Sequence, residues 1–341
     1  MSTPPAHLIP LGRDLGRVLV TGGAGLIGSA LIWALNQHGV DDIIVVDRLG
    51  TDDRWRNLAP LRFADYLEAD ELLDPLEADA FGGFDLILHM GANSNTMETD
   101  VRGLIRNNFE FTKAMAHHAV ARGTKFVYAS SAATYGDGAQ GMTDDQTVDH
   151  LHALRPLNAY GYSKHLFDVY AAQTGMLSDI VGLKYFNVFG PNEDHKGDMR
   201  SLVHKAYQQI RDTGRVKLFK SHRPDFKDGE QRRDFLYVKD AVAMTLHLAT
   251  TDGTAGLYNV GGGAAHTWLS LVHGIFAALN KPVEIEFIDM PEAIRDKYQY
   301  HTEASITKLR ATGYAAGVTP LADAVRDYVQ RYLVRDARLG D

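Results

Sequence analysis

Two residues four positions apart, Tyr160 and Lys164, suggest the most definite chemistry in this 341-residue sequence. A spacing of four places both side chains on one face of a helix. A free tyrosine has a pKa of about 10 and is a poor base at neutral pH, but a nearby ammonium group favours its phenolate form. A phenolate so placed can take the proton of an alcohol while hydride leaves the same carbon. The pair therefore predicts redox chemistry at a hydroxyl group.

A serine pair precedes this motif in the sequence. Ser130 and Ser131 follow a run of strand type, and Ser131 lies shortly before the predicted helix that carries Tyr160. A hydroxyl at this position could hydrogen-bond the reacting oxygen. The alternative is a serine that only caps a loop. Because Tyr160 and Lys164 follow, we expect Ser131 to be catalytic.

Three glycines, Gly22, Gly25 and Gly28, follow the apolar run Arg17–Thr21 and open a segment of helical spacing. Such a turn has three needs: a tight bend after the strand, close approach of the backbone to a pyrophosphate, and close packing of the helix on the sheet. Each of them favours a glycine, because glycine has no Cβ atom. The N-terminus of the helix then faces the phosphates. This placement predicts a dinucleotide-binding turn, with a plain tight turn as the alternative.

Asp47 ends the next apolar run, at the position where an acid usually binds the adenosine ribose. An acid there disfavours a 2′-phosphate, but Arg48 follows at once and Arg54 lies nearby. Two guanidinium groups could hold a phosphate that carries close to two charges. The alternative is a solvated strand end with a charged loop. The signal is mixed, and we expect NADP with NAD as the alternative.

These residues lie in a chain where runs of strand type alternate with helical patterns. Strands are predicted at Arg17–Thr21, Ile43–Asp47, Arg62–Tyr66, Asp85–His89, Lys125–Ser130, Ile180–Tyr185, Val216–Phe219, Asp234–Val238 and Val283–Ile288. Helices are predicted from Gly28 to His38 and over Glu98–Arg122, Leu157–Thr174, Arg200–Thr213, Lys239–Ala249 and Pro320–Leu333.

The alternation predicts an α/β fold, a Rossmann-like doubly wound parallel sheet with a smaller, discontinuous C-terminal substrate domain. We expect the dinucleotide-binding domain to comprise residues 17–186 and 234–262. The substrate-binding domain then comprises residues 187–233 and 263–335, and residues 1–16 form a loose leader. The smaller domain is expected to close over the carboxyl edge of the sheet, where ligands of such folds bind.

The composition excludes several classes of protein. The chain has no cysteine, which excludes a disulfide scaffold, a thiolate nucleophile and cysteine-ligated metals, and we expect no metal site. The net charge is −8 with interspersed signs, unlike the basic footprint of a nucleic-acid binder. No apolar run approaches the roughly 18 residues of a membrane span, and the start of the chain lacks the apolar region of a signal peptide. We therefore expect a cytoplasmic protein without nucleic-acid or membrane partners.

From about Arg17 to Leu333 the chain resembles the extended short-chain dehydrogenase/reductase family of nucleotide-sugar-modifying enzymes. Within this family the resemblance narrows to the ADP-L-glycero-D-manno-heptose 6-epimerases, because SSAATYG followed by an HKG loop looks specific to them. The matching segments are TGGAGLIGS at Thr21–Ser29, YASSAATYG at Tyr128–Gly136, PLNAYGYSK at Pro156–Lys164, YFNVFGPNEDHKGDM at Tyr185–Met199, RRDFLYV at Arg232–Val238 and YNVGGG at Tyr258–Gly263.

The resemblance implies inversion of C6 of the heptose in ADP-D-glycero-D-manno-heptose, by transient hydride transfer to bound NADP through a 6-keto intermediate. The product would feed synthesis of the lipopolysaccharide inner core. Ser131, Tyr160 and Lys164 match the catalytic residues of the family, and Lys196 matches a second acid/base. Such a second group is physically sensible, because hydride returns to the opposite face and the new alkoxide needs its own proton source. A cytoplasmic homo-oligomer, a pentamer or decamer, is also implied.

The glycine turn, the ribose-binding region and the family together give two sets of contacts. The residues expected at the cofactor are Gly22, Gly25, Leu26, Ile27, Gly28, Asp47, Arg48, Arg54, Met90, Gly91, Ala92, Asn93, Ser94, Asn107, Lys164, Val188 and Lys196. Those expected at the substrate are Ser131, Asn187, Asp198, Phe219, Lys220, Ser221, His222, Arg233 and Tyr298.

Three positions depart from the family pattern. Asp198 stands where the family often has a serine, Ala69 replaces a lysine that can bind the 2′-phosphate, and the stretch Lys220–Gln231 is longer than in some members. Two other functions stay open: another nucleotide-sugar epimerase, such as a 4-epimerase, and a non-catalytic cofactor-sensing regulator. The retained Tyr160 and Lys164 argue against the regulator. A 4,6-dehydratase would need an Asp-Glu pair just after the serines, where this chain has alanines.

Overall fold

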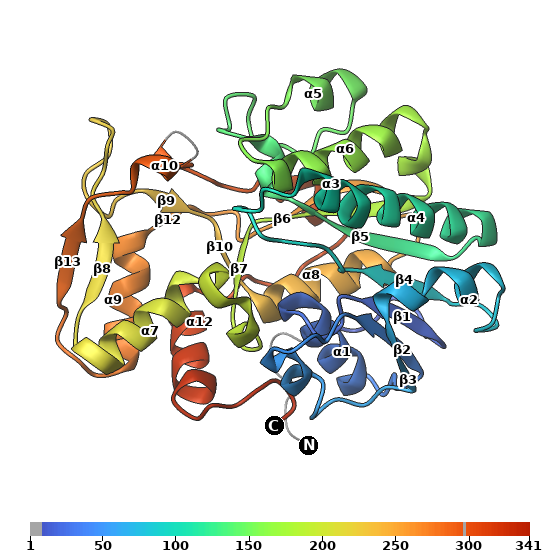
Figure 1. The fold of residues 1–341 in the computed structure, drawn as a ribbon, viewed down its shortest axis with the longest axis horizontal. Helices are drawn as coiled ribbons and strands as arrows, with labels where there is room; N and C mark the ends of the chain where they lie inside the picture. The colour runs from blue at the N-terminus through green and yellow to red at the C-terminus, as the bar shows by residue number, and fades with distance from the viewer. Residues whose placement is uncertain (1–8, 296–297) are drawn as a thin grey trace.

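A parallel sheet forms the centre of the computed structural model, which describes residues 9–295 and 298–341 (Figure 1). Within these residues the sheet has seven strands in the order β11-β6-β5-β4-β1-β2-β3, all paired in parallel. Their bounds are β1 Val18–Thr21, β2 Ile43–Asp47, β3 Asp65–Glu68, β4 Leu86–His89, β5 Lys125–Ser131, β6 Ile180–Tyr185 and β11 Gly256–Val260. The order reverses at β1, as in a doubly wound fold, so the predicted fold class is confirmed.

Helices cover both faces of this sheet (Figure 1). α1 (Leu26–Gln37) and α8 (Val238–Thr250) pack on one face and share a buried apolar cluster with β1. α4 (Phe111–Arg122) and α6 (Ala159–Gln173) contribute to a second buried cluster on the other face. Because both faces are buried, the central strands are continuous apolar runs rather than alternating ones.

Shorter helical segments complete this half of the molecule. They are η1 Asp53–Asn57, η2 Ala69–Glu71, α2 Leu73–Glu77, α3 Val101–Leu104, the π-helical turn Ile105–Glu110, η4 Ala132–Tyr135, α5 Val148–Ala153 and η5 Met176–Ser178. No helix of the described residues is long and apolar enough to cross a membrane.

A second group of elements lies beyond the carboxyl edge of the large sheet, at the left in Figure 1. Its strand pairs are β8 (Val216–Phe219) with β13 (Ile285–Ile288), β9 (Arg232–Arg233) with β12 (His266–Thr267), and β7 (Asn187–Phe189) with β10 (Phe235–Tyr237). Its helical segments are η6 Asp194–Met199, α7 Leu202–Thr213, α9 Trp268–Ala278, α10 Glu292–Arg295, α12 Leu321–Asp327 and the π-helical turn Tyr328–Leu333. α11 (Thr307–Ala311) lies instead beside β11 of the large sheet, where Lys308 Nζ donates to the Leu257 carbonyl oxygen at 2.7 Å. The residue limits of the two predicted domains stay a prediction.

The sequence did not predict β11 or α9. β11 is five residues long, begins at Gly256 and becomes a recognisable strand only through its pairing with β6. The weak third strand is also shifted, because β3 begins at Asp65 instead of Arg62. Of the predicted leader, residues 1–8 lie outside the described residues. In the rest, the Gly12 N–H donates to Thr250 Oγ1 (3.0 Å) and the Gly16 N–H to Asp85 Oδ2 (2.7 Å).

A fully buried ion pair joins α6 to the sheet. The Nζ atom of Lys184, on β6, donates to Asp168 Oδ2, on α6, at 2.8 Å, and neither side chain is exposed to solvent. The same carboxylate accepts hydrogen bonds from Tyr128 (2.8 Å) and Ser130 (2.8 Å), both on β5. Lys184 also donates to Thr134 Oγ1 at 2.7 Å. A buried charge is tolerated only when it is paired and hydrogen-bonded, so this network fixes how α6 lies on β5 and β6.

Loss of one partner should therefore be costly. We predict that Lys184→Met lowers the free energy of unfolding by about 3–5 kcal/mol, because it leaves the Asp168 charge buried and unpaired. Adding Asp168→Asn removes that charge and should recover part of the loss. Urea denaturation measures both variants. Arg211→Met, which removes an exposed pair with Asp212, is the control and should stay within about 1 kcal/mol. A loss below about 1 kcal/mol in Lys184→Met would contradict the prediction.

Candidate active site

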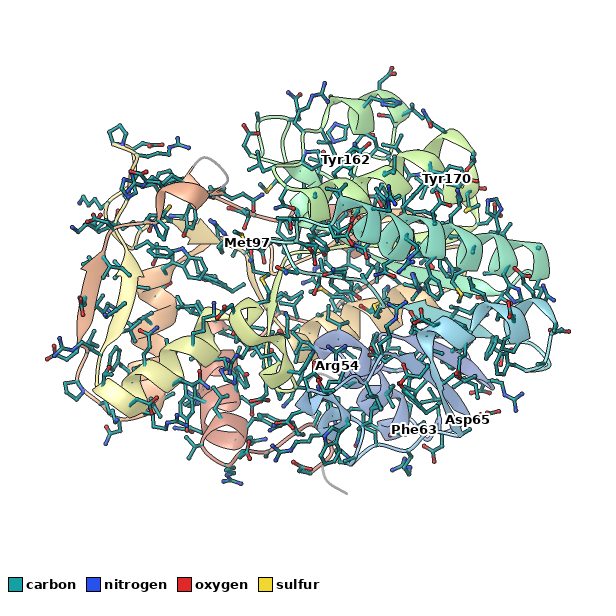
Figure 2. All side chains as sticks on the ribbon, viewed as in Figure 1. Arg54, Phe63, Asp65, Met97, Tyr162 and Tyr170 are labelled. Atoms are coloured by element: carbon teal, nitrogen blue, oxygen red, sulfur yellow. The ribbon has the colours of Figure 1, made fainter. Side chains whose placement is uncertain are left out.

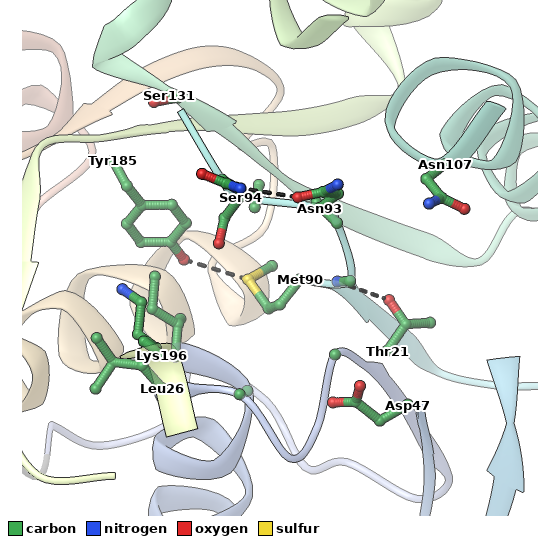
Figure 3. A pocket seen from close by; sticks show the side chains of 18 of the residues that line it. Thr21, Leu26, Asp47, Met90, Asn93, Ser94, Asn107, Ser131, Tyr185 and Lys196 are labelled. Carbon is green, nitrogen blue, oxygen red and sulfur yellow. Dashed lines mark hydrogen bonds between the residues drawn. The ribbon is translucent and has the colours of Figure 1, made fainter. Parts of the chain in front are cut away.

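A cavity of about 700 Å³ lies at the carboxyl edge of the large sheet (Figure 3). The glycine turn after β1, the ends of β2 and β4, the serines at the end of β5 and residues from α6 and η6 all line it. All the residues predicted to contact the cofactor are among its lining residues, and so are the four residues predicted to be catalytic. The cavity therefore collects, from distant parts of the sequence, the groups that the motifs singled out.

The glycine turn is packed too closely for side chains. A Cβ atom on Gly28 would lie 2.1 Å from the carbonyl oxygen of Gly22. Gly22 itself has a φ of +65°, and a Cβ there would come within 2.7 Å of the backbone of Gly91. The turn leads directly into α1, whose N-terminus faces the cavity. This arrangement suits the pyrophosphate of a dinucleotide, which needs close backbone approach and favourable N–H groups.

Asp47 is tied to this turn. Its Oδ2 atom accepts a hydrogen bond from the Ala24 N–H at 2.8 Å, and its Oδ1 atom accepts one from the Arg48 N–H at 2.7 Å. Burial raises the pKa of Asp47, while these two hydrogen bonds and the charge of Arg54 partly oppose the shift. Asp47 thus stabilises the glycine turn that lines the cofactor cavity. Its position in the sequence did not indicate this role.

Both arginines beside Asp47 already have carboxylate partners. Arg54 binds Asp52 through two nitrogens, with Nη2–Oδ2 and Nε–Oδ1 distances of 2.7 and 2.9 Å. Arg48 contacts Asp70, with an Nε–Oδ2 distance of 3.3 Å. Figure 2 shows Arg54 beside the N-terminal segments, near the middle of the molecule. Such partly exposed pairs contribute about 0–1 kcal/mol each, so an incoming phosphate can compete for these guanidinium groups.

Two helix caps position Ser131 and Tyr160. Ser131 caps η4, and its Oγ atom accepts a hydrogen bond from the Ala133 N–H at 3.1 Å. Asn158 caps α6 in the same way through the Gly161 N–H at 2.8 Å. Gly161 packs so closely on Ala133 that a Cβ would lie 2.8 Å from its carbonyl oxygen. The close packing brings the start of α6 against the serine loop.

The burial of Tyr160 and Lys164 changes the expected proton equilibrium. Burial raises the pKa of Tyr160, and a hydrogen bond with Ser131 only partly opposes it. Burial also lowers the pKa of Lys164 to about 8, against the opposing charge of Asp168. Lys164 Nζ donates to the Ala129 carbonyl oxygen at 2.9 Å. In the free protein burial therefore opposes the phenolate form of Tyr160, and the phenolate expected for the reaction stays a prediction for the state with bound ligands.

Lys196 reaches the cavity from a separate part of the chain. It lies on η6, between β7 and α7, and its side chain is half-buried. Figure 3 shows Lys196 beside Leu26 and near Tyr185, with Asp47 farther along the same cavity. Tyr160, in contrast, comes from α6. The cavity is therefore lined by two potential proton carriers that different elements position independently.

Most of the predicted substrate residues do not line this cavity. Ser131 does, whereas the others lie outside it: Asn187, Asp198, Phe219, Lys220, Ser221, His222, Arg233 and Tyr298. Lys220 pairs with Asp289 at 3.2 Å. Ser221 and His222 are held by backbone N–H hydrogen bonds to Asp228 Oδ1 (2.7 Å) and Tyr300 Oη (3.0 Å).

Arg233 is a buried cation in this outer group. Its guanidinium carbon lies 5.0 Å from the ring centre of Tyr298 and 5.7 Å from that of Trp268. Its Nη1 atom donates to the carbonyl oxygen of Arg232 at 2.8 Å. Burial lowers the pKa of Arg233. Among the described residues we find no carboxylate paired with it, and a buried guanidinium without such a partner favours an anionic ligand.

Sequence reasoning missed several lining residues. They are Thr21, Val46, Asn95, Phe111, Ala129, Tyr185, Phe186, His195 and Met199. Ala69 was noted only as a departure from the family, and Ser130 only as the neighbour of Ser131. Tyr185 hydrogen-bonds Thr245 Oγ1 at 2.7 Å and Met90 Sδ at 3.5 Å. Burial, with the charges of Arg54 and Lys196, lowers the pKa of His195 to about 4. Tyr185 and His195 lie in a segment that resembles the family, and only this resemblance could have identified them from the sequence.

Comparison with known proteins agrees with this architecture. The sequence model of the NAD dependent epimerase/dehydratase family matches residues 18–261. The ADP-L-glycero-D-manno-heptose-6-epimerase of Nitratidesulfovibrio vulgaris is 49% identical over 92% of this chain and 97% of its own length.

Two solved structures are similar over nearly the whole chain. The Helicobacter pylori ADP-L-glycero-D-manno-heptose-6-epimerase has a TM-score of 0.77 at 26% identity, covering 95% of this chain and 98% of its own. The Thermus thermophilus UDP-glucose 4-epimerase in complex with NAD has a TM-score of 0.72 at 27% identity, covering 93% and 99%. The chain therefore belongs to the NAD dependent epimerase/dehydratase family and, within it, to the ADP-L-glycero-D-manno-heptose-6-epimerases, as an isomerase that uses a nicotinamide cofactor.

Proposed function

We propose that this epimerase converts ADP-D-glycero-D-manno-heptose to ADP-L-glycero-D-manno-heptose by inverting C6 through a 6-keto intermediate. The observation that carries the proposal is that Tyr160 and Lys196 line one cavity from two different elements. A dehydrogenase that releases a ketone needs one acid/base, whereas an epimerase must handle an alcohol on either face of the same ketone. The names of the similar proteins from N. vulgaris and H. pylori support the choice of substrate.

We assign the catalytic steps to four side chains. A bound nicotinamide dinucleotide supplies the acceptor and donor of the hydride. Tyr160 takes the proton from the hydroxyl of one epimer, and Lys196 exchanges a proton with the hydroxyl of the other. The Ser131 hydroxyl hydrogen-bonds the reacting oxygen. Lys164 lies one helical turn after Tyr160, where its ammonium form favours the phenolate once ligands bring further positive charge.

We propose that the outer group binds the nucleotide part of the substrate. The buried guanidinium of Arg233 is suited to the pyrophosphate, because an unpaired buried cation gains most from an anion. The ring of Tyr298 then orients Arg233, and the remaining contacts come from Asn187, Asp198, Phe219, Lys220, Ser221 and His222. These residues do not line the cavity of the free protein, so a substrate that reaches them must extend out of the cavity along the second group of elements, of which Lys196 and Val188 already line it.

We further propose that the cofactor is NADP. Arg48 and Arg54 both line the adenosine end of the cavity, and both are held by exchangeable carboxylates. The remaining cofactor contacts are those of the glycine turn, the loop Met90–Ser94, Asn107 and Val188. Their place on the cavity wall, and the space left free by the glycines, support this assignment.

The wider setting follows from the same resemblance. We propose a cytoplasmic homo-oligomer, a pentamer or decamer, that supplies the L-heptose unit of the lipopolysaccharide inner core. We also propose that the chain divides into the two domains given above, with the active site between them.

The route of the hydrogen tests the reaction itself. C6 of the heptose has no adjacent carbonyl, so a carbanion there would be very costly, and hydride transfer predicts that turnover in D₂O leaves almost no deuterium at C6. Substrate deuterated at C6 should keep its label in the product. Mass spectrometry of the product checks both expectations. Stoichiometric uptake of solvent deuterium at C6, or no turnover of this substrate, would contradict the proposal.

Two substitutions test the roles of the acid/base residues. Tyr160→Phe and Lys196→Met should each lower turnover by about 10²-fold or more, the effect expected when a general acid/base is lost. Cofactor affinity should stay nearly unchanged in both. Tyr162→Phe is the matched control for the first, because Tyr162 lies half-exposed on the same helix (Figure 2). Lys205→Met, on α7, is the control for the second. Turnover near that of the wild type in either test variant would refute the role of that residue.

The cofactor preference is tested at Arg48. We predict that Arg48→Ala weakens NADP binding by about 10-fold or more, because a charge-assisted hydrogen bond to a phosphate is worth about 1.5–3 kcal/mol. The affinity for NAD should change by less than about threefold. Calorimetric titration of cofactor-free protein measures both. Arg62→Ala, which removes an exposed pair with Asp41 outside the cavity, is the control. Equal losses for NADP and NAD would exclude a 2′-phosphate role.

A further inference from the structure

The backbone before Lys196 is anchored at three consecutive residues, Asn192, Glu193 and Asp194. Glu193 is fully buried, and its two carboxylate oxygens accept hydrogen bonds from the Ser201 N–H and Oγ, both at 2.6 Å. Because Glu193 directly precedes η6 and Ser201 directly precedes α7, these bonds hold the starts of the two helical segments together. Asn192 and Asp194 also contact the end of the chain, more than a hundred residues away: Asn192 binds Leu339, and Asp194 binds Arg338.

Asn192 is a buried junction between three segments. Its Oδ1 atom accepts a hydrogen bond from the Leu339 N–H at 3.0 Å, and its Nδ2 atom donates to Ser29 Oγ at 2.9 Å. Its carbonyl oxygen accepts a hydrogen bond from Asn57 Nδ2 at 3.0 Å. Its φ of +76° lies in the left-handed region, which Asn adopts more readily than most residues. The loop that leads to Lys196 is thus bound both to the cofactor-binding helix α1 and to the segment after η7.

Asp194 binds a buried arginine from that same segment. Its Oδ2 atom lies 3.4 Å from Arg338 Nη2, and its Oδ1 atom accepts a hydrogen bond from His204 Nε2 at 2.9 Å. Burial acts to raise the pKa of Asp194, but His204 and Arg338 together lower it below its usual value. Arg338 is 6% exposed, and a guanidinium this buried needs an anion. Its other carboxylate partner, Asp336, lies 3.3 Å away on its own segment, so Asp194 is the anion that links it to Lys196.

The segment that carries Arg338 crosses from one half of the molecule to the other. Figure 1 shows the chain after α12 running back to the N-terminal elements beside α1. There Leu339 is almost fully buried, and Asp336 pairs with Arg56, one residue before Asn57, at 3.2 Å. The segment therefore ties η1, which carries Arg54, to the loop of η6, which carries Lys196.

We propose that Arg338, together with Leu339, is a positioning residue for Lys196. The Arg338–Asp194 ion pair and the Leu339–Asn192 hydrogen bond fix the start of η6, so that the Lys196 side chain points into the cavity. Without them, Lys196 can retreat toward solvent, since Gly197 beside it has open space around it and a φ of +52°. This inference rests on the proposed role of Lys196 as the acid/base for one epimer.

The test measures the two epimers separately. Cofactor-loaded enzyme is mixed with the D-glycero or the L-glycero substrate, and the single-turnover rate of hydride transfer is recorded for each. Arg338→Met and Asp194→Asn should each slow the reaction of one epimer by about 10-fold or more, and the other by less than about threefold, as a misplaced acid/base predicts. The slowed epimer should be the one affected by Lys196→Met. Arg338→Lys, which keeps the charge, should restore part of the rate.

A purely structural role for Arg338 would slow both epimers alike. Equal slowing, or no slowing, in Arg338→Met and Asp194→Asn overturns the inference while leaving the proposed function intact. If Lys196→Met itself slows both epimers equally, the proposed role of Lys196 fails first, and this inference falls with it. Arg326→Met, which removes an exposed pair with Asp323 on α12, is the control and should match the wild type. Melting temperature and cofactor content show that each variant is folded, and Asp194→Asn decides the question if Arg338→Met does not fold.

Discussion

The buried carboxylate of Asp168 is the constraint on which the geometry of this active site depends. It must be paired, and its partners come from three strand positions, Tyr128 and Ser130 on β5 and Lys184 on β6. Since α6 can satisfy this charge in only one register, the helix is fixed along the sheet. Lys164 lies one turn before Asp168 and Tyr160 two turns before it, so the same register points both toward the end of β5.

Burial has a second consequence for the chemistry. Burial raises the pKa of Tyr160 and lowers that of Lys164, so it opposes the charged form of both groups. A site of this kind becomes strongly polarised only when charged ligands enter it, because charges interact more strongly where water is excluded. Asp168 therefore has two effects. It holds α6 on the sheet through Lys184, and its charge favours the ammonium form of Lys164.

The cofactor end and the Lys196 end of the cavity are also mechanically connected. Asn57 Nδ2 donates to the carbonyl oxygens of Ala24 and Asn192, at 2.8 and 3.0 Å, and lies 3.3 Å from His195 Nδ1. One buried side chain thus contacts both the glycine turn and the loop of η6. The glycine turn and the segment that carries Lys196 are therefore held in place by the same side chain.

The sequence by itself determined the local elements and the motifs they carry. Apolar runs bounded by turn residues located six of the seven strands of the sheet, and the spacing of Tyr160 and Lys164 placed both on one helix, because these signals depend on neighbours in the chain. The glycines at positions 22 and 28 were readable for the same reason. Family resemblance added Lys196, which no local pattern distinguishes from a solvated loop lysine.

Only the tertiary structure decided the rest. β11 is a strand because β6 pairs with it, and Asp47 hydrogen-bonds the glycine turn because the fold brings the end of β2 beside it. The raised pKa of Tyr160 and the lowered pKa of Lys164 follow from burial, which depends on residues far away in sequence. The contacts of Arg338 with Asp194 and of Leu339 with Asn192 join residues more than 140 positions apart. Spacing along a chain carries no information about such contacts, since they form only when the two halves pack together.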